Sequence, residues 1–561
     1  MLEPQKFARV VIPSRLKHPL VYAIPTALLD RIAPGMRVLI PLQKRTMTGV
    51  VWEIIEQSSL LEVKQILAVM DDLTILDVDL LKLAQWISQY YLAPLGEVLG
   101  TMLPPNSRRE SQRTVRLQAN HPPVGDELEQ KIVQFVHQRK GKITVKLLTR
   151  QFPEQNIESL ITRLELQGVI DIEDHLAKQR QKPHAAPNSV RSAAVSAGNR
   201  FQLTAEQDLA LRPIAQQLEQ NSFMTFLLHG VTGSGKTEVY LRAIEHARSL
   251  GRSSLVLIPE ISLTPQLLDR VTARFPGKVG VLHSALTAAE RWAQWWHIAN
   301  GNVDVVVGAR SAVFAPLPKL GLIVVDEEHD SSYKQEDSLR YNGRDVAVVR
   351  GKLQGCPVIL GSATPALESY ENCRQGRYQL LEITKRVEKR PLPTIELCDL
   401  RTQYRSPDSA KRTPHKGSIV AAKDNDQPLM SKLFIEALQQ NFSAKRQTLI
   451  FLNRRGFANF LQCTSCGYVW RCPHCSVTLT LHLKHKQLSC HHCDYRRPTT
   501  NVCPECKNES LTAIGAGTEQ IEATLQQIVP DARIARMDRD TTGRRGSHEA
   551  LIRGWEKGEI D

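Results

Sequence analysis

Residues 223–246 read FMTFLLHGVTGSGKTEVYLRAIEH, and this stretch decides the fold class of the region around it. Gly230 to Thr237 fit the pattern G-x-x-x-x-G-K-[ST], with an apolar strand before them and a helical pattern after them. Glycines let the backbone wrap phosphate groups, and the N–H groups at the helix start point toward them. We therefore predict a phosphate-binding loop (P-loop); a chance match in a glycine-rich turn is the alternative. The predicted ATP-binding residues are Gln207, Gly230, Val231, Thr232, Gly233, Ser234, Gly235, Lys236 and Thr237.

A second motif, LIVVDEEH, ends in acidic residues after a run typical of a buried strand. Lys236 is expected to reach the β- and γ-phosphates and Thr237 to hold Mg²⁺. Asp326 is expected to bind Mg²⁺ through water, and Glu327 to polarise the attacking water. An acidic strand end on the surface is the alternative. The predicted catalytic residues are Lys236, Thr237, Asp326 and Glu327.

The order of apolar runs predicts a multidomain α/β fold. Between residues 201 and 400, buried strands alternate with helical patterns, as in a parallel sheet of the nucleoside-triphosphatase kind. One of these strands ends in GSATP, residues 361–365, whose small hydroxyl side chains are suited to sensing the nucleotide state. RQTLIFLNRRG, residues 446–456, restarts the pattern. We expect two RecA-like parallel-sheet lobes, the second incomplete.

The first 200 residues have a different pattern. Short β-rich runs separated by turns predict a small β-barrel or sandwich, and three helical patterns followed by a strand pair predict a winged helix. The expected domains are a β-rich module (1–105), a winged helix (106–175), a linker (176–200), lobe 1 (201–400), a flexible polar segment (401–428), the start of lobe 2 (429–462), a two-zinc module (463–508) and the continuation of lobe 2 (509–561).

Eight of the eleven cysteines form four C-x-x-C pairs that interrupt the second lobe. This pattern suits two tetrahedral Zn²⁺ sites with four cysteine ligands each, a double zinc ribbon; disulfides are the alternative. Spacing alone does not assign the pairing. The strand pattern TLTLHL between the second and third pairs suggests a hairpin with its own metal, which favours a nested arrangement. One zinc would then bind Cys472, Cys475, Cys490 and Cys493, and the other Cys463, Cys466, Cys503 and Cys506.

The net charge of +14 favours a polyanionic partner, with nucleic acid as the first candidate and a solvated basic surface as the alternative. The segment DSSYKQEDSLRYNGRD alternates tyrosines, which stack on bases, with cations, which hold the backbone. Local packing of the tyrosines is the alternative. The predicted DNA-binding residues are Arg310, Ser311, Tyr333, Lys334, Arg340, Tyr341 and Arg344. We find no secretion signal and no apolar run that spans a bilayer, so we expect a cytoplasmic protein without a membrane partner.

Together these motifs resemble superfamily 2 helicases and, within them, the bacterial primosomal replication-restart helicases (the primosomal protein N′, or PriA, family). The stretches that carry the resemblance are GVTGSGKTEVY, VVDEEHDSSYKQE, GSATPALES, FLNRRGFA, GTEQIEATL and RMDRDTT, with the eight cysteines. The resemblance implies ATP-driven 3′-to-5′ unwinding of DNA, recognition of stalled or abandoned forks and D-loops, and initiation of primosome assembly. It implies that the β-rich module (1–105) binds DNA ends. It also implies ATP, Mg²⁺ and two Zn²⁺ as cofactors. The implied partners are forked and single-stranded DNA, primosome proteins, single-strand DNA-binding protein and the machinery that loads the replicative helicase.

Three departures from the family pattern lower some of these expectations. Val21 stands where the family carries an aspartate, which weakens the case for recognition of a free 3′-OH end. Leu339 stands where an aromatic residue is common. The chain also stops before the last helicase motifs, so we expect very weak ATP hydrolysis and no processive unwinding. Two alternatives stay open: a non-catalytic fork-binding scaffold for primosome partners, and an RNA helicase or other translocase with a zinc ribbon.

Overall fold

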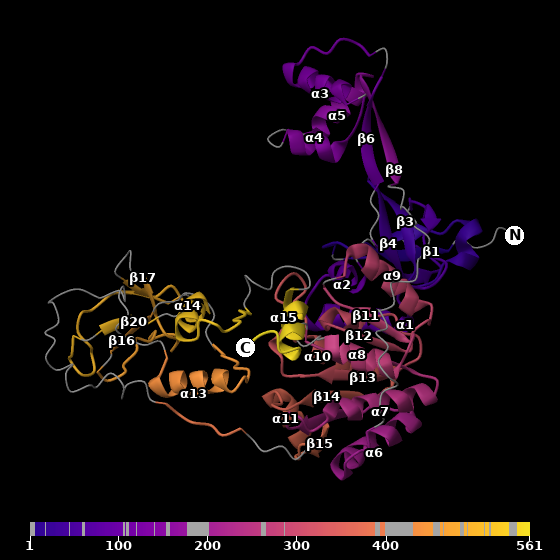
Figure 1. Ribbon diagram of the computed structural model, residues 1–561. Helices are drawn as coiled ribbons and strands as arrows, with labels where there is room; N and C mark the ends of the chain where they lie inside the picture. The colour runs from indigo at the N-terminus through magenta and orange to yellow at the C-terminus, as the bar shows by residue number, and fades with distance from the viewer. Residues whose placement is uncertain are drawn as a thin grey trace. The chain divides into compact units, whose positions relative to one another are not determined.

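The computed structural model (Figure 1) describes residues 6–561 except 17, 44, 59–61, 105–106, 108–110, 119–120, 140, 153–156, 177–200, 260–264, 285, 388–392, 399–429, 453–459, 464, 483–486, 491, 510, 515–517 and 538–546. The chain forms two compact units, residues 1–390 and 391–561. The predicted linker from 177 onward and the predicted polar segment 401–428 lie outside the described residues. No helix in the described part of the chain is long and apolar enough to cross a membrane.

A seven-stranded parallel sheet forms the centre of the first unit (Figure 1). Its order is β11-β12-β10-β13-β14-β9-β15, and all neighbouring pairs are parallel. The strands are nearly continuous runs of Val, Ile and Leu because both faces of the sheet are covered. They are β9 (Thr225–Gly230), β10 (Ser253–Leu257), β11 (Val279–Leu282), β12 (Val305–Gly308), β13 (Leu320–Asp326), β14 (Val358–Ser362) and β15 (Gln379–Ile383).

Alternate strand residues enter two separate cores, one on each face of the sheet. One core contains Phe226 and Leu228 with helices α6 (Ala205–Gln220), α7 (Lys236–Ser249) and α8 (Pro265–Arg274). The opposite core contains Leu227 with helices α9 (Ala288–Ala299) and α10 (Gly343–Gln354). Helix α11 (Leu367–Arg374) follows β14. This is the RecA-like parallel-sheet architecture predicted for the first lobe.

The N-terminal module is a five-stranded antiparallel sheet in the order β2-β1-β4-β3-β5, followed by two helices. Its first helix packs against α10 of the lobe and shares its core, and the Asn342 N–H donates to the Tyr91 hydroxyl at 3.0 Å. The module and the lobe are therefore one packed body. The elements are β1 (Phe7–Val11), β2 (Leu20–Ala23), β3 (Arg37–Leu42), β4 (Arg45–Ile55), β5 (Ala68–Val69), α1 (Val78–Tyr90) and α2 (Leu95–Met102).

The next module has the helix order predicted for a winged helix, with one strand between the first two helices. Its strands form a three-stranded antiparallel sheet, β7-β6-β8, rather than only a strand pair, because β6 from before the first helix joins it. The elements are β6 (Ser111–Leu117), α3 (Glu127–Gln138), β7 (Lys142–Thr144), α4 (Val145–Gln151), α5 (Ile157–Leu166) and β8 (Ile170–Leu176).

In the second unit, α13 (Lys432–Ser443) and α14 (Thr518–Ile528) pack together around Leu438 and Leu525, and α15 (Ser547–Glu556) follows. Residues 446–452, the described part of the stretch predicted to restart the α/β pattern, form no strand. Leu449 and Phe451 are each 81% exposed, and the Thr448 N–H donates to the Asp561 carbonyl instead of a neighbouring strand. Parallel pairing for a second lobe is thus absent from the described residues of this unit.

Arg350 on α10 gives a test of the packing between this helix and the loop after β12. Its side chain is 1% exposed, and it donates to the carbonyls of Val313 and Ala315 at 2.5 and 2.8 Å. Burial lowers the pKa of Arg350 to about 10. We expect Arg350→Met to lower the free energy of unfolding by about 2–4 kcal/mol, since it leaves the Val313 carbonyl unpaired and the Ala315 carbonyl with only its bond from the Leu317 N–H. Chemical denaturation measures this change.

The matched control is Lys352→Met on the same helix, because Lys352 is exposed. Surface substitutions of this kind change stability by roughly 0.5 kcal/mol or less. Equal effects of the two substitutions would contradict a structural role for the Arg350 hydrogen bonds.

Candidate nucleotide-binding site and cysteine clusters

The loop between β9 and α7 has the backbone of a phosphate-binding loop. Gly233 and Gly235 have φ angles of +82° and +81°, in the left-handed region that favours glycine. A Cβ on Gly235 would also lie 2.3 Å from Nε2 of Gln207. Helix α7 starts at Lys236, so its first N–H groups face the loop. Val231, Thr232 and Gly233 are exposed, and Thr237 is half-buried in the first turn of α7.

Lys236 and Gln207 both contact the loop itself. Lys236 Nζ donates to the Gly230 carbonyl at 2.8 Å. Gln207 is buried; its Nε2 donates to the Ser234 carbonyl at 2.8 Å, and its Oε1 accepts from the Thr204 N–H at 2.9 Å. Both polar atoms of Gln207 are thus engaged within the chain. Its predicted contact with adenine remains a prediction.

Asp326 ends β13, which is separated from β9 only by β14. The carboxyl ends of parallel strands meet at one edge of a sheet, so Asp326 and Glu327 lie on the same edge as the P-loop. The Tyr240 hydroxyl on α7 donates to Asp326 Oδ1 at 3.1 Å. Burial and the nearby Glu327 charge raise the pKa of Asp326, while the Tyr240 hydroxyl and Lys236 oppose the rise. The four predicted catalytic residues are therefore brought together.

The remaining DEEH residues join this site to the GSATP segment. Glu328 is 1% exposed; it accepts from the Ala366 N–H at 2.7 Å and the Ser369 hydroxyl at 2.8 Å, and pairs with Arg344 at 3.1 Å. His329 Nδ1 lies 2.8 Å from the Ser362 hydroxyl. These side chains give a direct physical link between two motifs that lie more than 30 residues apart. Tyr240 and Glu328 were not among the predicted site residues; only the position of Glu328 inside the acidic motif signalled it.

The structure contradicts one expectation about DNA binding. Tyr333 and Tyr341 are each 1% exposed, so neither ring is available to stack on a base in this structure. The Tyr333 hydroxyl donates to the Asp326 carbonyl at 2.6 Å, and the Tyr341 ring packs on Phe314. Leu339 is also buried. Alternation of tyrosines and cations in sequence did not reveal that the aromatic rings turn inward.

The basic residues of this region divide into two groups. Residues 330–345, which carry Tyr333 and Tyr341, are here called the tyrosine loop. Arg310 donates to the carbonyls of Ser332 and Lys334, at 2.8 and 2.9 Å, and thereby holds this loop in place. Arg344 is engaged by Glu328 and Asp345. The side chains of Ser311, Lys334 and Arg340 are exposed, so of the predicted DNA-binding residues these three are the most accessible to a phosphate backbone.

The eight paired cysteines of the second unit come together in two groups of four, in the nested arrangement favoured by the sequence. In each group the sulfurs lie within 4.8 Å of one another. Three cross-pair distances are 3.5–3.6 Å, close to the roughly 3.8 Å edge of a tetrahedron with Zn–S bonds of about 2.3 Å, and far from a disulfide bond of about 2.0 Å. The groups are Cys463, Cys466, Cys503, Cys506 and Cys472, Cys475, Cys490, Cys493.

All four C-x-x-C pairs adopt the same turn. In each, the residue after the second cysteine has a positive φ, and its N–H donates to the carbonyl of the first cysteine. These turn residues are Gly467, Ser476, Asp494 and Lys507. Short antiparallel strands carry the turns: β16 (Phe460–Cys463) with β20 (Leu511–Ile514), and β17 (Thr480–His482), β18 (Gln487–Ser489) and β19 (Arg496–Pro498). The backbone therefore presents both groups as metal-binding centres.

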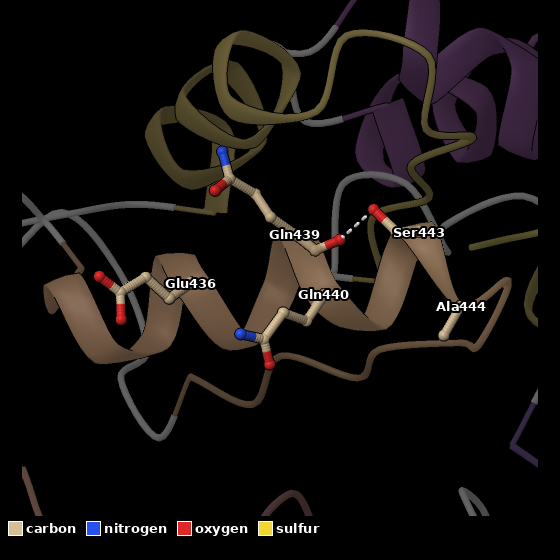
Figure 2. A pocket seen from close by; sticks show the side chains of 5 residues that line it. All are labelled: Glu436, Gln439, Gln440, Ser443 and Ala444. Atoms are coloured by element: carbon tan, nitrogen blue, oxygen red, sulfur yellow. Dashed lines mark hydrogen bonds between the residues drawn. The ribbon is translucent and has the colours of Figure 1, made fainter.

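Besides the cysteine groups, the second unit has a shallow depression on the surface of α13 (Figure 2). Its lining comes from one helix face, and the Ser443 hydroxyl donates to the Gln439 carbonyl at 2.8 Å. The one charged lining residue, Glu436, pairs with Lys432 of the same helix at 3.9 Å, and we assign the depression no ligand. The lining residues are Glu436, Gln439, Gln440, Ser443 and Ala444.

Three family models match the chain. They are the PriA 3′DNA-binding domain at residues 9–104, the DEAD/DEAH box helicase at residues 204–373, and the PriA DNA helicase Cys-rich region domain at residues 472–498. The helicase match spans both the P-loop and the acidic motif. The third match contains the whole group Cys472, Cys475, Cys490 and Cys493 and none of the cysteines of the other group.

Similar proteins cover almost the whole chain. The replication restart protein PriA of Bacillus subtilis (strain 168) is 33% identical over 625 residues, covering 99% of this chain and 75% of that protein. The protein of the same name from Chlamydia muridarum is 38% identical over 583 residues, covering 99% and 73%. Among solved structures, RecG bound to a three-way DNA junction matches with a TM-score of 0.25 and 24% identity over 33% of this chain and 24% of that one, too low to support an argument.

The raised pKa of Asp326 predicts a pH-dependent effect of Asp326→Asn. A carboxyl group with a raised folded pKa binds its proton more tightly in the folded state, so its charge destabilises the fold at higher pH. Without nucleotide or divalent cation, we expect the substitution to raise the thermal midpoint at pH 8, because it removes the buried charge. The gain should shrink as the pH falls toward about 4, the unfolded pKa.

Asp337→Asn is the control, because Asp337 is exposed. Thermal unfolding at several pH values compares the two. A gain for Asp326→Asn that does not depend on pH, or that equals the control at every pH, would show that the charge at Asp326 is not the cause.

Proposed function

This chain belongs to the PriA family of replication restart proteins, and on that basis we propose that it is an ATP-dependent helicase that unwinds DNA in the 3′-to-5′ direction. The proposed substrates are stalled or abandoned replication forks and D-loops, where it would initiate primosome assembly. One observation carries the ATP-dependent part: the P-loop at the end of β9 and the acidic motif at the end of β13 lie on one edge of the sheet, with Tyr240 bonded to Asp326 between them.

The chemistry assigned to these residues is positioning and charge stabilisation. Lys236 would leave its bond to the Gly230 carbonyl and contact the β- and γ-phosphates. Thr237 and Asp326 would hold Mg²⁺, which neutralises charge on the phosphate oxygens when bound. Glu327 would orient and polarise the attacking water. The donor set, one hydroxyl and one carboxylate beside the P-loop, suits Mg²⁺.

A link between hydrolysis and DNA follows from two contacts of the tyrosine loop. The Tyr333 hydroxyl donates to the Asp326 carbonyl, and Arg310 donates to the carbonyls of the residues on either side of Tyr333 in the sequence. The exposed Lys334 and Arg340 would hold phosphates of a single strand. A shift of Asp326 during hydrolysis would therefore move Tyr333 and, with it, the loop that carries these cations. We propose this as the route by which the nucleotide state changes the grip on DNA.

The two cysteine groups are proposed to bind one Zn²⁺ each and to fold the insert around the metals. The insert would serve partner docking and strand separation. The proposed partners are primosome proteins, single-strand DNA-binding protein and the replicative-helicase loading machinery. The N-terminal module is proposed to bind DNA ends; Val21 lies on β2 opposite Arg9 and brings no carboxylate to a 3′-OH.

Lys236→Ala tests the motor. We expect it to lower fork-stimulated ATP hydrolysis by about a hundredfold or more, because a charge that stabilises the transferring phosphoryl group is lost. The Kd for forked DNA, measured at fixed salt, should change less than about twofold, because Lys236 lies at the nucleotide site. Lys278→Ala, an exposed lysine just before β11, is the control and should leave both quantities unchanged. Unchanged hydrolysis in Lys236→Ala would refute the proposed role of the P-loop.

Cysteine substitution tests the metal centres. We expect about two zinc per chain, measured by elemental analysis, and about one in Cys472→Ser, because one ligand set loses a thiolate. Cys373→Ser on α11, outside both groups, should keep two. The same zinc content per chain in all three proteins would argue against zinc binding by the group that contains Cys472.

A further inference from the structure

The chain that follows β15 runs along the P-loop. The Val231 N–H donates to the Ile383 carbonyl at 3.2 Å, and the Val387 N–H donates to the Gly233 carbonyl at 3.1 Å. Residues 384–387, here called the exit segment, therefore pair with the loop that binds phosphate. No helicase motif identified in the sequence includes them.

Helix α6 fixes the start of the exit segment. Glu206, in the first turn of α6, accepts from the N–H groups of Thr384 and Lys385 at 2.9 and 3.0 Å and from the Thr384 hydroxyl at 3.1 Å. The same helix carries Gln207, which bonds the Ser234 carbonyl. Hydrogen bonds thus join the α6 N-terminus, the P-loop and the exit segment. They fix the backbone of the exit segment and therefore the positions from which its side chains extend.

Arg386 is the residue of this segment whose side chain lies on the P-loop. Its Cγ and Cδ lie 3.9 and 4.0 Å from the position that a Cβ on Gly233 would take. Val387 lies beside it, 47% exposed, with Cγ2 3.1 Å from the corresponding position on Gly235. Arg386 is half-buried, and within the described part of the chain no hydrogen bond or ion pair engages its guanidinium group. A cation held over a P-loop without a protein partner is available to a ligand.

The order of the strands indicates whether Arg386 lies near the phosphate end or the nucleoside end of a bound nucleotide. β15 borders β9 on one side, and β14 and β13 lie on the other. The acidic residues that act on the γ-phosphate are on the β13 side. The nucleoside end of a bound nucleotide therefore extends toward the flank of β15. The amide of Gln207, the only side chain assigned to the base from sequence, is already engaged by Thr204 and Ser234.

We propose that Arg386 binds the purine base of the nucleotide, with its guanidinium stacked on the ring and Val387 as the apolar edge of the base site. The proposal rests on the proposed function, because it needs ATP or ADP at the P-loop. Planar guanidinium groups stack well on aromatic rings, and the contact contributes without a specific hydrogen-bond pattern.

The test compares two probes on the zinc-loaded full chain by calorimetry with Mg²⁺: ADP, which carries a base, and inorganic tripolyphosphate, which does not. We expect Arg386→Ala to raise the Kd of ADP about tenfold and the Kd of tripolyphosphate less than about twofold. Lys385→Ala is the matched control. Lys385 is the preceding residue and its ammonium group makes only an exposed pair with Glu206, so neither Kd should change by more than about twofold.

Each other outcome has a defined meaning. An equal rise in both Kd values would overturn the proposal and make Arg386 a phosphate ligand. An unchanged Kd for ADP would overturn it as well. If the unaltered, folded chain bound tripolyphosphate but did not distinguish ADP from it, the base site would be refuted while the P-loop assignment stood. Failure of the unaltered chain to bind either probe would instead refute the nucleotide site and the proposed function with it.

Discussion

The position of the Asp326 carboxyl group is the constraint on which the rest of the helicase site depends. Its backbone pairs with Gly361 of β14, its side chain accepts from Tyr240 on α7, and its carbonyl accepts from Tyr333 in the tyrosine loop. One residue is thus tied to the helix of the P-loop, to the strand that ends in GSATP and to the loop that carries exposed cations. Glycine at 361 is part of this arrangement, since a Cβ there would lie 1.6 Å from the Tyr240 hydroxyl oxygen.

Local patterns were sufficient for the parts of the site whose chemistry depends on spacing. The glycines of the P-loop, the acidic strand end and the four cysteine pairs require residues at fixed short separations, and the structure brings each set together. The parallel sheet of the first unit followed from its Val- and Ile-rich runs. The inward orientation of Tyr333 and Tyr341 could not be predicted from the sequence of their own loop. It depends on contacts with Asp326, Phe314 and Arg310, which lie outside that loop. Residues 446–452, predicted to restart the α/β pattern, form no strand for a related reason: strand propensity takes effect only where a neighbouring strand is available to pair.

The cysteine region shows how a small fold is specified without a large apolar core. Four copies of one turn place eight sulfurs, and the strands between them are only three or four residues long. Trp470 and Leu488 belong to one small buried cluster with cysteines of both groups, and both are almost fully buried. Strands this short are marginal on their own, and a metal ion bound by each cysteine group would supply the missing stability.

The core shared by α1 and α10 constrains how the N-terminal module and the lobe can evolve. Leu80, Leu83 and Ile87 of α1 are completely buried in the same cluster as strand residues of the lobe. A lobe separated from this helix would expose a continuous apolar surface, and such surfaces promote aggregation. Recombination that exchanged the N-terminal module for an unrelated one would therefore have to supply a matching apolar helix. The module and the lobe are expected to be passed on and to diversify as a pair, with compensating changes on the two sides of their common core.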